Sequence, residues 1–418
     1  MWDVLIAGAG PAGSLAATIL SRAGARVLLL DRARFPRDKL CGDGINPGAI
    51  GILRRWNLAK RVEQHGLPIE GMMVCGAPDV QIAARYPANL RGRSIMRRDL
   101  DQWLLEEAIA SGVQFEEAVT VQRPVLHAAN GGSGGLCVAG AVVTSHAQRE
   151  VSIRSRVTIA ADGRRSKLAF GLRLATSAAH PRRWAIGAYV EGGTGTRGMG
   201  EMHIHPGRYI GVAPLPGGLT NVCVVGGPDV LGRLNDPQRA LRTAIDGDPM
   251  LRDRFAGVRF VTRSVVLGPL AIDSTSAGVA GLLLAGDAAG FVDPMTGDGL
   301  RFALRGGELA AETAIDMLAT GNVNGHLDLG RKRRSAFVSK WRFDRALRRL
   351  VDSPAALRIA TFGAAVAPLW IQPLVAFAGD CDTLEASSPY ECDRRHIDCS
   401  AAAPPHPRGR EDVHAEGV

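Results

Sequence analysis

The chain has 418 residues, of which 46% are hydrophobic and 22% are charged, so it has the composition of a globular protein and room for two domains. Its formal net charge of +9 favours anionic partners, but only 5% of its residues are aromatic and no basic–aromatic motif is present, so we expect no nucleic-acid partner. Its seven cysteines show neither C-x-x-C nor metal-ligand spacing, which predicts no metal site and favours a reducing, cytoplasmic location over a disulfide framework.

The first 31 residues predict a βαβ unit. Apolar runs indicate a buried strand at 4–7 and a second strand at 27–30, and a helical pattern at 14–23 lies between them. The first strand and the helix are joined by Gly8-Ala9-Gly10-Pro11-Ala12-Gly13, and the second strand ends at Asp31. This is a G-x-G-x-x-G sequence in the strand–turn–helix–strand context that dinucleotide binding requires.

Each residue type in this motif suits a dinucleotide. Gly8 permits the tight turn, Gly10 lets the backbone approach a pyrophosphate, and Gly13 lets the helix lie close to the strand. The helix N-terminus offers N–H groups to phosphates, and Asp31 can accept hydrogen bonds from ribose hydroxyls. If the glycine turn served only to pack the helix on the strand, an acidic residue at position 31 would not be required.

Patterns further along the chain predict the remaining elements of the first half. Residues 32–50 form a long polar, glycine-rich connection, and long ordered loops are usually functional. A helix is expected to begin at Asp99, as its N-cap, and to end at Gly112. Other runs predict a helix at 50–60 and strands within 67–95 and at 113–115, 119–121, 136–143, 150–153 and 157–161.

The second half begins with a strand-rich region. Residues 174–266 consist mostly of short strands and turns, which predicts a separate sheet. A third buried strand follows and ends at Asp287, and a Pro/Gly-containing turn leads into a helix at 300–319. A basic helical stretch at 331–349 and an apolar stretch at 355–379 precede a polar, aperiodic end.

Three predicted strands thus end in an acid: Asp31, Asp162 and Asp287. Ligands of a doubly wound sheet bind at the carboxyl ends of its strands, so these acids are expected near one another. Asp287 would hold a sugar or ribityl hydroxyl, and the turn at Gly297 and Gly299 would present N–H groups to a flavin ring. Asp162 has a second interpretation, as a cap of the turn that follows it.

These motifs resemble those of the p-hydroxybenzoate hydroxylase-type superfamily of FAD-dependent oxidoreductases, which includes monooxygenases and geranylgeranyl reductases. The loop Lys39-Leu40-Cys41-Gly42-Asp43-Gly44 is similar to the Lys-x-Cys-Gly loop of the geranylgeranyl reductase-like branch, and Gly290 stands where many hydroxylases carry His. The reductases' Tyr-x-Trp-x-Phe-Pro strand reads Tyr209-Ile210-Gly211-Val212-Ala213-Pro214 here, which changes the expected pocket. The Trp-x-Trp-x-Ile-Pro motif of flavin halogenases is not in the sequence.

The resemblance implies an α/β fold in which a Rossmann-like, doubly wound FAD-binding domain with a three-stranded antiparallel excursion is interrupted by a β-rich substrate domain. We expect the FAD-binding domain at 1–65, 97–172 and 280–330, and the β-sheet substrate domain at 66–96 and 173–279. A C-terminal helical segment at 331–379 and a disordered tail at 380–418 complete the expected organisation.

The resemblance also implies FAD as the cofactor. Because the sequence has no second dinucleotide motif, NAD(P)H would bind transiently as the reductant, or another donor would reduce the flavin. Arg97 would reach the pyrophosphate or the ribityl chain. Taken with the glycines of the two turns, the expected FAD contacts are Gly8, Gly10, Ala12, Gly13, Asp31, Gly42, Asp43, Ile45, Arg97, Val121, Asp287, Gly297, Gly299 and Leu300.

Three further residues are candidates for the chemistry. Cys41 would be catalytic near the flavin or, alternatively, a small buried loop residue. Tyr209 and Pro294 would contact substrate, although a tyrosine on a strand is more often part of a core. Cys392, His396 and Cys399 lack structured ligand spacing, so we expect no metal there.

The motifs together predict a FAD-dependent oxidoreductase for an apolar small molecule, which would be an isoprenoid, a polyketide or a quinone-like compound. Reduction of an activated double bond is the first hypothesis, and hydroxylation of an aromatic or polyketide substrate is the alternative. A non-catalytic, flavin-bound lipid carrier is the alternative from another class. The sequence leaves the oligomeric state open.

The apolar stretch at 355–379 also has two interpretations. Pro368 and Pro373 interrupt it, so we interpret it as a pair of helices packed over the substrate cavity and not as a bilayer-spanning segment. A peripheral membrane contact beside the basic run at 331–334 is the alternative.

Overall fold

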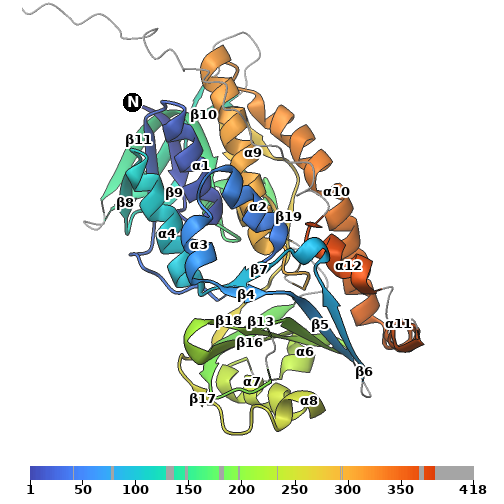
Figure 1. The fold of residues 1–418 in the computed structure, drawn as a ribbon. Helices are drawn as coiled ribbons and strands as arrows, with labels where there is room; N and C mark the ends of the chain where they lie inside the picture. The colour runs from blue at the N-terminus through green and yellow to red at the C-terminus, as the bar shows by residue number, and fades with distance from the viewer. Residues whose placement is uncertain are drawn as a thin grey trace, which may run out of the picture.

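The computed structural model describes residues 1–381 except 41, 77–79, 129–135, 146–148, 178–182, 196–197, 233, 292, 294 and 367–370. It has two large sheets, and helices cover one face of the N-terminal sheet (Figure 1). The sequence expectations at Cys41, Pro294 and Cys392–Cys399 fall outside the described residues.

The N-terminal sheet contains the βαβ unit. Its main path runs β20 (Gly278–Val279), β21 (Leu282–Leu284), β11 (Glu150–Ala160), β1 (Trp2–Ala7), β2 (Val27–Asp31) and β8 (Gln114–Glu117). All neighbours from β21 to β8 pair in parallel, and β20 is antiparallel. The carboxyl ends of five parallel strands therefore share one edge of the sheet.

Strand β11 belongs to two layers. We predicted two strands, at 150–153 and 157–161, and the structure has one continuous strand instead. Its first half pairs antiparallel with β10 (Leu136–Thr144), which also pairs with β9 (Thr120–Ala128), and its second half pairs in parallel with β1. The first half is mostly exposed and the last four residues are all buried, as expected of a strand that passes from a surface layer into a central sheet.

Helices pack on the face of the N-terminal sheet opposite the β9–β10 layer (Figure 1). They are α1 (Pro11–Arg22), α2 (Pro47–Arg55), α3 (Lys60–His65), α4 (Arg97–Ala110), α9 (Gly299–Thr320) and α10 (Gly325–Asp352). The N-cap of α4 is Met96 and not Asp99 as predicted. Asp99 lies in the first turn of α4, where its negative charge still complements the helix dipole.

The second sheet combines two separate stretches of the chain. Its path runs β17 (Arg259–Phe260), β13 (Trp184–Glu191), β16 (Leu219–Gly226), β15 (Arg208–Pro214), β14 (Gly200–His205), β5 (Gly71–Gly76) and β6 (Val80–Arg85), and β18 (Val265–Leu267) pairs with β13. One face packs on α6 (Pro228–Leu231), α7 (Pro237–Asp246) and α8 (Pro249–Arg252) around Phe255. The other face forms an apolar cluster with Met295 and with Leu347 and Val351 of α10.

Smaller elements connect the two sheets. A three-stranded sheet has the order β3 (Gly44–Ile45), β7 (Gly92–Ser94) and β4 (Leu67–Ile69), and β12 (Ala175–Ser177) pairs with β19 (Ile272–Ser274). The short helical elements are α5 (Lys167–Gly171), η1 (Pro87–Asn89), η2 (Pro216–Gly218) and η3 (Gly286–Ala289).

The apolar stretch near the C-terminus forms α11 (Pro354–Val366) and α12 (Ile371–Ala378). No described helix is both long and apolar enough to cross a bilayer. Of the expected tail at 380–418, the structure describes two residues: Asp380 forms an ion pair with Arg301, and Cys381 is buried. The rest of that tail lies outside the described residues.

Candidate active site

The three acids and the glycine motif lie at one edge of the N-terminal sheet. Gly8 follows β1, Asp31 ends β2, Asp162 follows β11, and Asp287 lies in η3 directly after β21. These four strands are adjacent and parallel in the sheet, so their carboxyl ends bring segments up to 279 residues apart in sequence to the same edge.

The glycine motif allows three backbones to approach closely. Gly8 has φ +100°, and a Cβ there would lie 2.4 Å from the carbonyl oxygen of Ala161. A Cβ at Gly13 would lie 1.8 Å from the carbonyl oxygen of Gly8. Gly10 is the N-cap of α1, and the nearest atom to a Cβ there would be Arg37 Nη2 at 3.4 Å. No side chain caps this helix end, so its N–H groups suit an anion such as a pyrophosphate.

Asp31 is held in a fixed orientation. Its side chain is 8% exposed, and Oδ2 accepts from Ala9 N and Oδ1 from Ala33 N, both at 2.8 Å. Each carboxylate oxygen has a further lone pair, so the group can still accept hydrogen bonds from a ribose. The geometry therefore fits the nucleotide part of FAD.

Positive charge gathers beside the glycine motif. Arg97 Nη2 and Arg37 Nη2 lie 2.9 and 3.1 Å from the buried carboxylate of Asp101. Burial and the Arg97 guanidinium lower the pKa of Lys39, and Asp287 and Asp101 act in the opposite direction. Arg37 Nε has no hydrogen-bond partner among the described residues. Arg37 Nε also lies 4.0 Å from Asp31 Oδ2, so these cations face carboxylates on several sides, and their guanidinium groups are suited to bind a diphosphate.

The glycine-rich loop after β2 is tied to the second sheet. Asp43 has φ +53° and is fully buried, and its carboxylate accepts from Asn221 of β16 and, at 2.9 Å, from Arg97 N. Burial raises the pKa of Asp43 to about 6 although these hydrogen bonds oppose the shift. Gly42 beside it is exposed, and Ile45 of β3 is buried in the core.

Other expected contacts are distributed around the same edge. Ala12 is buried in the first turn of α1, and a Cβ on Gly286 of η3 would lie 3.0 Å from Ala12 Cβ. Val121 of β9 is buried in the core between the two layers of the N-terminal sheet. Asp162 Oδ2 accepts from Lys167 N at 3.2 Å, but the side-chain cap of α5 is Ser166, and burial raises the pKa of Asp162 to about 6.

The turn into α9 lies against the C-terminal helices. Gly297 has φ +72°, Asp298 is the N-cap, and Gly299 and Leu300 begin the helix. Asp298 Oδ1 accepts from Asn46 Nδ2 at 2.8 Å, and Lys340 Nζ of α10 lies 3.5 Å from Oδ2. Burial raises the pKa of Asp298 to about 6, against the opposing charges of Lys340 and Arg301.

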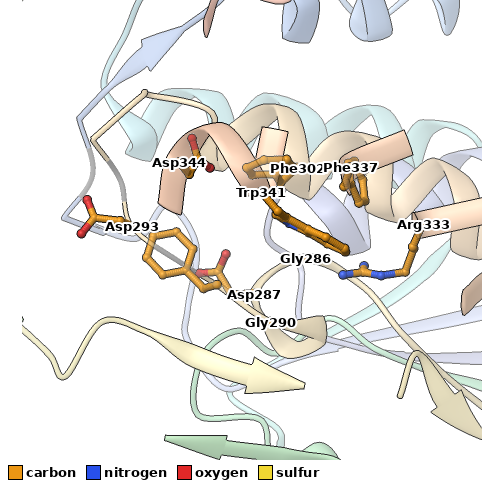
Figure 2. A pocket seen from close by; sticks show the side chains of 10 residues that line it. Gly286, Asp287, Gly290, Asp293, Phe302, Arg333, Phe337, Trp341 and Asp344 are labelled. Carbon is orange, nitrogen blue, oxygen red and sulfur yellow. The ribbon is translucent and has the colours of Figure 1, made fainter. Parts of the chain in front are cut away.

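A small cavity of about 20 Å³ lies between η3, the segment that follows it, and helices α9 and α10 (Figure 2). Aromatic rings of α9 and α10 form one side, and Asp287, Asp293 and Asp344 line it as well. The residues that line it are Gly286, Asp287, Gly290, Phe291, Asp293, Phe302, Arg333, Phe337, Trp341 and Asp344. The four lining residues from α10 were not predicted from the sequence. Arginine and lysine are so frequent in that stretch that the pattern of its buried face is hard to recognise.

Tyr209 lies at the boundary between the cavity and the second sheet. Its hydroxyl donates to Asp293 Oδ1 at 2.6 Å, and Arg183 Nη1 lies 3.5 Å from the other oxygen. Burial, and then the Asp293 charge, raise the pKa of Tyr209. Tyr209 packs in an apolar cluster with Ala185, Met295 and Val351, so in this structure it is a core residue whose hydroxyl contacts Asp293, one of the residues that line the cavity.

Comparisons with known proteins agree with this geometry. Residues 1–185 match a family described as "FAD binding domain". The chain is 31% identical over 337 residues to menaquinone reductase of Mycolicibacterium smegmatis, an alignment that covers 78% of each protein. It is 29% identical over 338 residues to digeranylgeranylglycerophospholipid reductase 1 of Methanopyrus kandleri, which covers 76% of this chain and 81% of that protein.

Solved structures share the fold. A flavoprotein/dehydrogenase of Cytophaga hutchinsonii has a TM-score of 0.78 at 21% identity, over 90% of this chain and 93% of that one. A geranylgeranyl bacteriochlorophyll reductase-like protein of Thermoplasma acidophilum has a TM-score of 0.74 at 20% identity, over 91% of each. A flavin-dependent brominase has a TM-score of 0.76 at 20% identity, over 91% of this chain and 94% of that one. One architecture thus occurs with different reactions.

Proposed function

The chain belongs to the geranylgeranyl reductase-like branch of the p-hydroxybenzoate hydroxylase-type FAD-dependent oxidoreductases, and on this basis we propose that it reduces a carbon–carbon double bond of an isoprenoid or quinone-like molecule. Relatives named menaquinone reductase and digeranylgeranylglycerophospholipid reductase support this choice of substrate class. Bound FAD would supply hydride transfer. The protein would position the substrate and exclude water.

The observation that carries the proposal is the apolar cluster between the second sheet and α10. Leu40 of the glycine-rich loop and Met295 of the turn before α9 both belong to it, together with Cys223 and Leu347. Those two segments are the ones we expect to hold the flavin ring. An apolar substrate chain bound in this cluster would therefore reach the flavin ring, while the polar groups around the cluster would remain out of contact with the chain.

The expected FAD contacts remain part of the proposal. The edge of the N-terminal sheet would hold the adenosine and pyrophosphate through Gly10, Asp31 and the cations near Asp101, and the turn at Gly297 and Gly299 would hold the ring. We also propose that 1–65, 97–172 and 280–330 form the FAD-binding domain and that 66–96 and 173–279 form the substrate domain. The two-sheet architecture supports this division.

Anaerobic turnover tests the reaction. The purified protein with FAD is reduced by NADPH and mixed with a menaquinone or a polyprenyl lipid, and products are identified by mass spectrometry. A product that gains two hydrogens without oxygen supports the reductase. A product that gains oxygen only in air identifies a monooxygenase, and reduced flavin without any product identifies a carrier.

We further propose that the substrate is taken from an anionic lipid surface on the cytoplasmic side of a membrane. Ile359 and Phe362 of α11 are 75% and 72% exposed, and no ion pair holds the exposed Arg345 or Arg349 of α10 within the described part of the chain. Helix α11 projects at one end of the molecule beside α10 (Figure 1). Apolar side chains beside arginines suit insertion between acidic headgroups.

Co-sedimentation with vesicles containing phosphatidylglycerol tests this surface. Phe362→Asp should abolish binding, and Val261→Asp, at an exposed residue that follows β17 in the second sheet, should leave it unchanged. Equal binding by both variants, or wild-type protein that stays in the supernatant, would contradict the membrane contact.

A further inference from the structure

Helix α10 carries one acid on its buried apolar face. Phe337 and Val351 are fully buried, Trp341 lines the cavity, and Asp344 lies between them at helical spacing. Asp344 is only 2% exposed. A carboxylate so placed is costly unless it is paired or has a function, because burial disfavours its charged form.

The two oxygens of Asp344 have different surroundings. Oδ1 accepts a hydrogen bond from Thr296 Oγ1 at 2.9 Å. Oδ2 is buried and has no hydrogen-bond partner in the part of the chain that the structure describes. Thr296 belongs to the turn that leads into α9, the segment expected to face the flavin ring. Figure 2 shows Asp344 on the cavity wall, near Phe302 and Trp341.

The charges that face Asp344 come from three segments. Burial is the largest influence and raises the pKa of Asp344 to about 7. Asp298 at the start of α9 and Asp293 in the preceding segment raise it as well. The Thr296 hydrogen bond and Lys340, one turn away on α10, lower it. The carboxyl group can therefore both hold and release a proton near neutral pH.

The other buried acids near the cavity have their oxygens occupied. Asp298 interacts with Asn46 and Lys340, and Asp293 accepts at Oδ1 from Tyr209 and from Met295 N, while its Oδ2 lies 3.5 Å from Arg183 Nη1. Asp162 has an unpartnered Oδ1, but it follows β11 and does not line the cavity. Asp344 is thus a buried acid that lines the cavity and has one oxygen without a hydrogen-bond partner among the described residues.

We infer that Asp344 is the proton donor of the proposed double-bond reduction. One alkene carbon accepts a hydride, whose two electrons a nicotinamide cofactor supplies through FAD. The other carbon forms a C–H bond with the proton of Asp344 while the O–H bond breaks, and a carboxylate remains. Thr296 occupies Oδ1, so the proton is placed on Oδ2, and water restores it after each turnover. This inference rests on the proposed function.

Single-turnover kinetics of the pre-reduced enzyme test the assignment. Asp344→Asn should slow reduction of the double bond by about 100-fold or more, which is the usual scale for losing a general acid. Asp344→Glu should recover part of the rate with a shifted pH profile. The matched control is Asp328→Asn, which changes an exposed acid on the same helix and should leave rate and profile unchanged.

Infrared spectroscopy of the FAD-loaded protein gives a second readout that does not depend on turnover. Besides the bands of Asp43, Asp162 and Asp298, which should titrate near pH 6, the wild type should have a protonated-carboxyl band that titrates near pH 7, and this one band should be missing in Asp344→Asn. An active wild type, with Asp344→Asn equally fast and the band retained, overturns the assignment alone. A wild type that cannot reduce either substrate class overturns the proposed function and the assignment with it.

Discussion

Two clusters of buried charged side chains contain similar residue types, but they shift the pKa values of their carboxyl groups in opposite directions. The sheet cluster lies between β14 of the second sheet and the two ends of α8, and it consists of Glu201, His203, Asp248 and Arg254. The edge cluster lies at the turn into α9 and consists of Asp298, Lys340 and Asp344. The first cluster pairs its charges closely, and the second leaves one oxygen of Asp344 without a hydrogen-bond partner among the described residues.

In the sheet cluster, every carboxylate faces a cation at hydrogen-bond distance. His203 is 1% exposed, with Nε2 at 3.0 Å from Glu201 and Nδ1 at 3.0 Å from Asp248, and Arg254 binds both oxygens of Glu201. Burial opposes the charge on His203, but hydrogen bonds to Asp248, Cys75 and Glu201 raise its pKa to about 11. Burial also acts against the charge on Asp248, yet His203 and His205 hold its pKa below the usual range.

In the edge cluster, burial dominates. It raises the pKa of Asp298 to about 6 and that of Asp344 to about 7, because Lys340 lies no closer than 3.5 Å to Asp298 and Asp344 Oδ2 has no partner among the described residues. This difference indicates that buried charges are closely paired where they contribute only to the stability of the fold. Carboxyl groups that can take up a proton remain where the chemistry is proposed, at a cost in stability.

The largest expected effect comes from breaking the sheet cluster. His203→Gln removes the cation between two buried carboxylates, so the free energy of unfolding at pH 6 should fall by about 3–5 kcal/mol. His205→Gln leaves His203 in place and should cost only about 1 kcal/mol. Urea unfolding followed by circular dichroism measures both. Equal losses would show that the sheet cluster does not depend on His203.

Removal of the edge cation should cost less. Lys340→Met deprives Asp298 of its partner, but Asp298 already has a pKa of about 6 and can take up a proton. We expect a loss of about 2 kcal/mol at pH 8 and a smaller loss at pH 5. Lys332→Met, at a surface ion pair of the same helix, is the control and should change stability by less than about 0.5 kcal/mol. A pH-independent loss for Lys340→Met would contradict this view.

Asp344→Asn should stabilise the protein at alkaline pH. The folded pKa of Asp344, about 7, lies above its ordinary value of 3.8, so its charge destabilises the folded state fully above pH 7 and not at all below about pH 4. We expect a gain of about 1–2 kcal/mol at pH 8 that vanishes at pH 4. Thermal unfolding of wild type, Asp344→Asn and Asp328→Asn over this range measures it. A loss of stability at both pH values would mean that Asp344 is structurally required.

The smallest expected effect lies between the two clusters. Tyr209→Phe removes the hydrogen bond to Asp293, which still accepts from Met295 N and faces Arg183. The free energy of unfolding should fall by about 1 kcal/mol, because one buried hydrogen bond to a charged group is lost. A loss above about 3 kcal/mol would show that Tyr209 alone stabilises the buried carboxyl group of Asp293. Unfolding measured at pH 7 distinguishes the small loss from the large one.

Local sequence patterns were sufficient to predict the edge of the N-terminal sheet at which we expect the dinucleotide to bind. The βαβ unit from Trp2 to Asp31, its glycine turn and the strand that precedes Asp287 are local patterns, and each requires a residue type that few others can replace. The general rule that ligands meet the carboxyl ends of parallel strands was then enough to predict that Asp31, Asp162 and Asp287 lie near one another. In the sheet, β21 lies next to β11 and only β1 separates β11 from β2, which agrees with that prediction.

The burial of individual charged residues and the pairing of distant strands could not be predicted in this way, because they depend on how separate elements pack together. Lys340 and Asp344 lie in a stretch dominated by arginines, and their burial follows from the packing of α10 on α9 and against the second sheet. The same holds for β11, which is continuous because two different layers pair with its two halves. Burial and pairing over long sequence distances set these charges and strands, and a local pattern carries no information about which face a later element will cover.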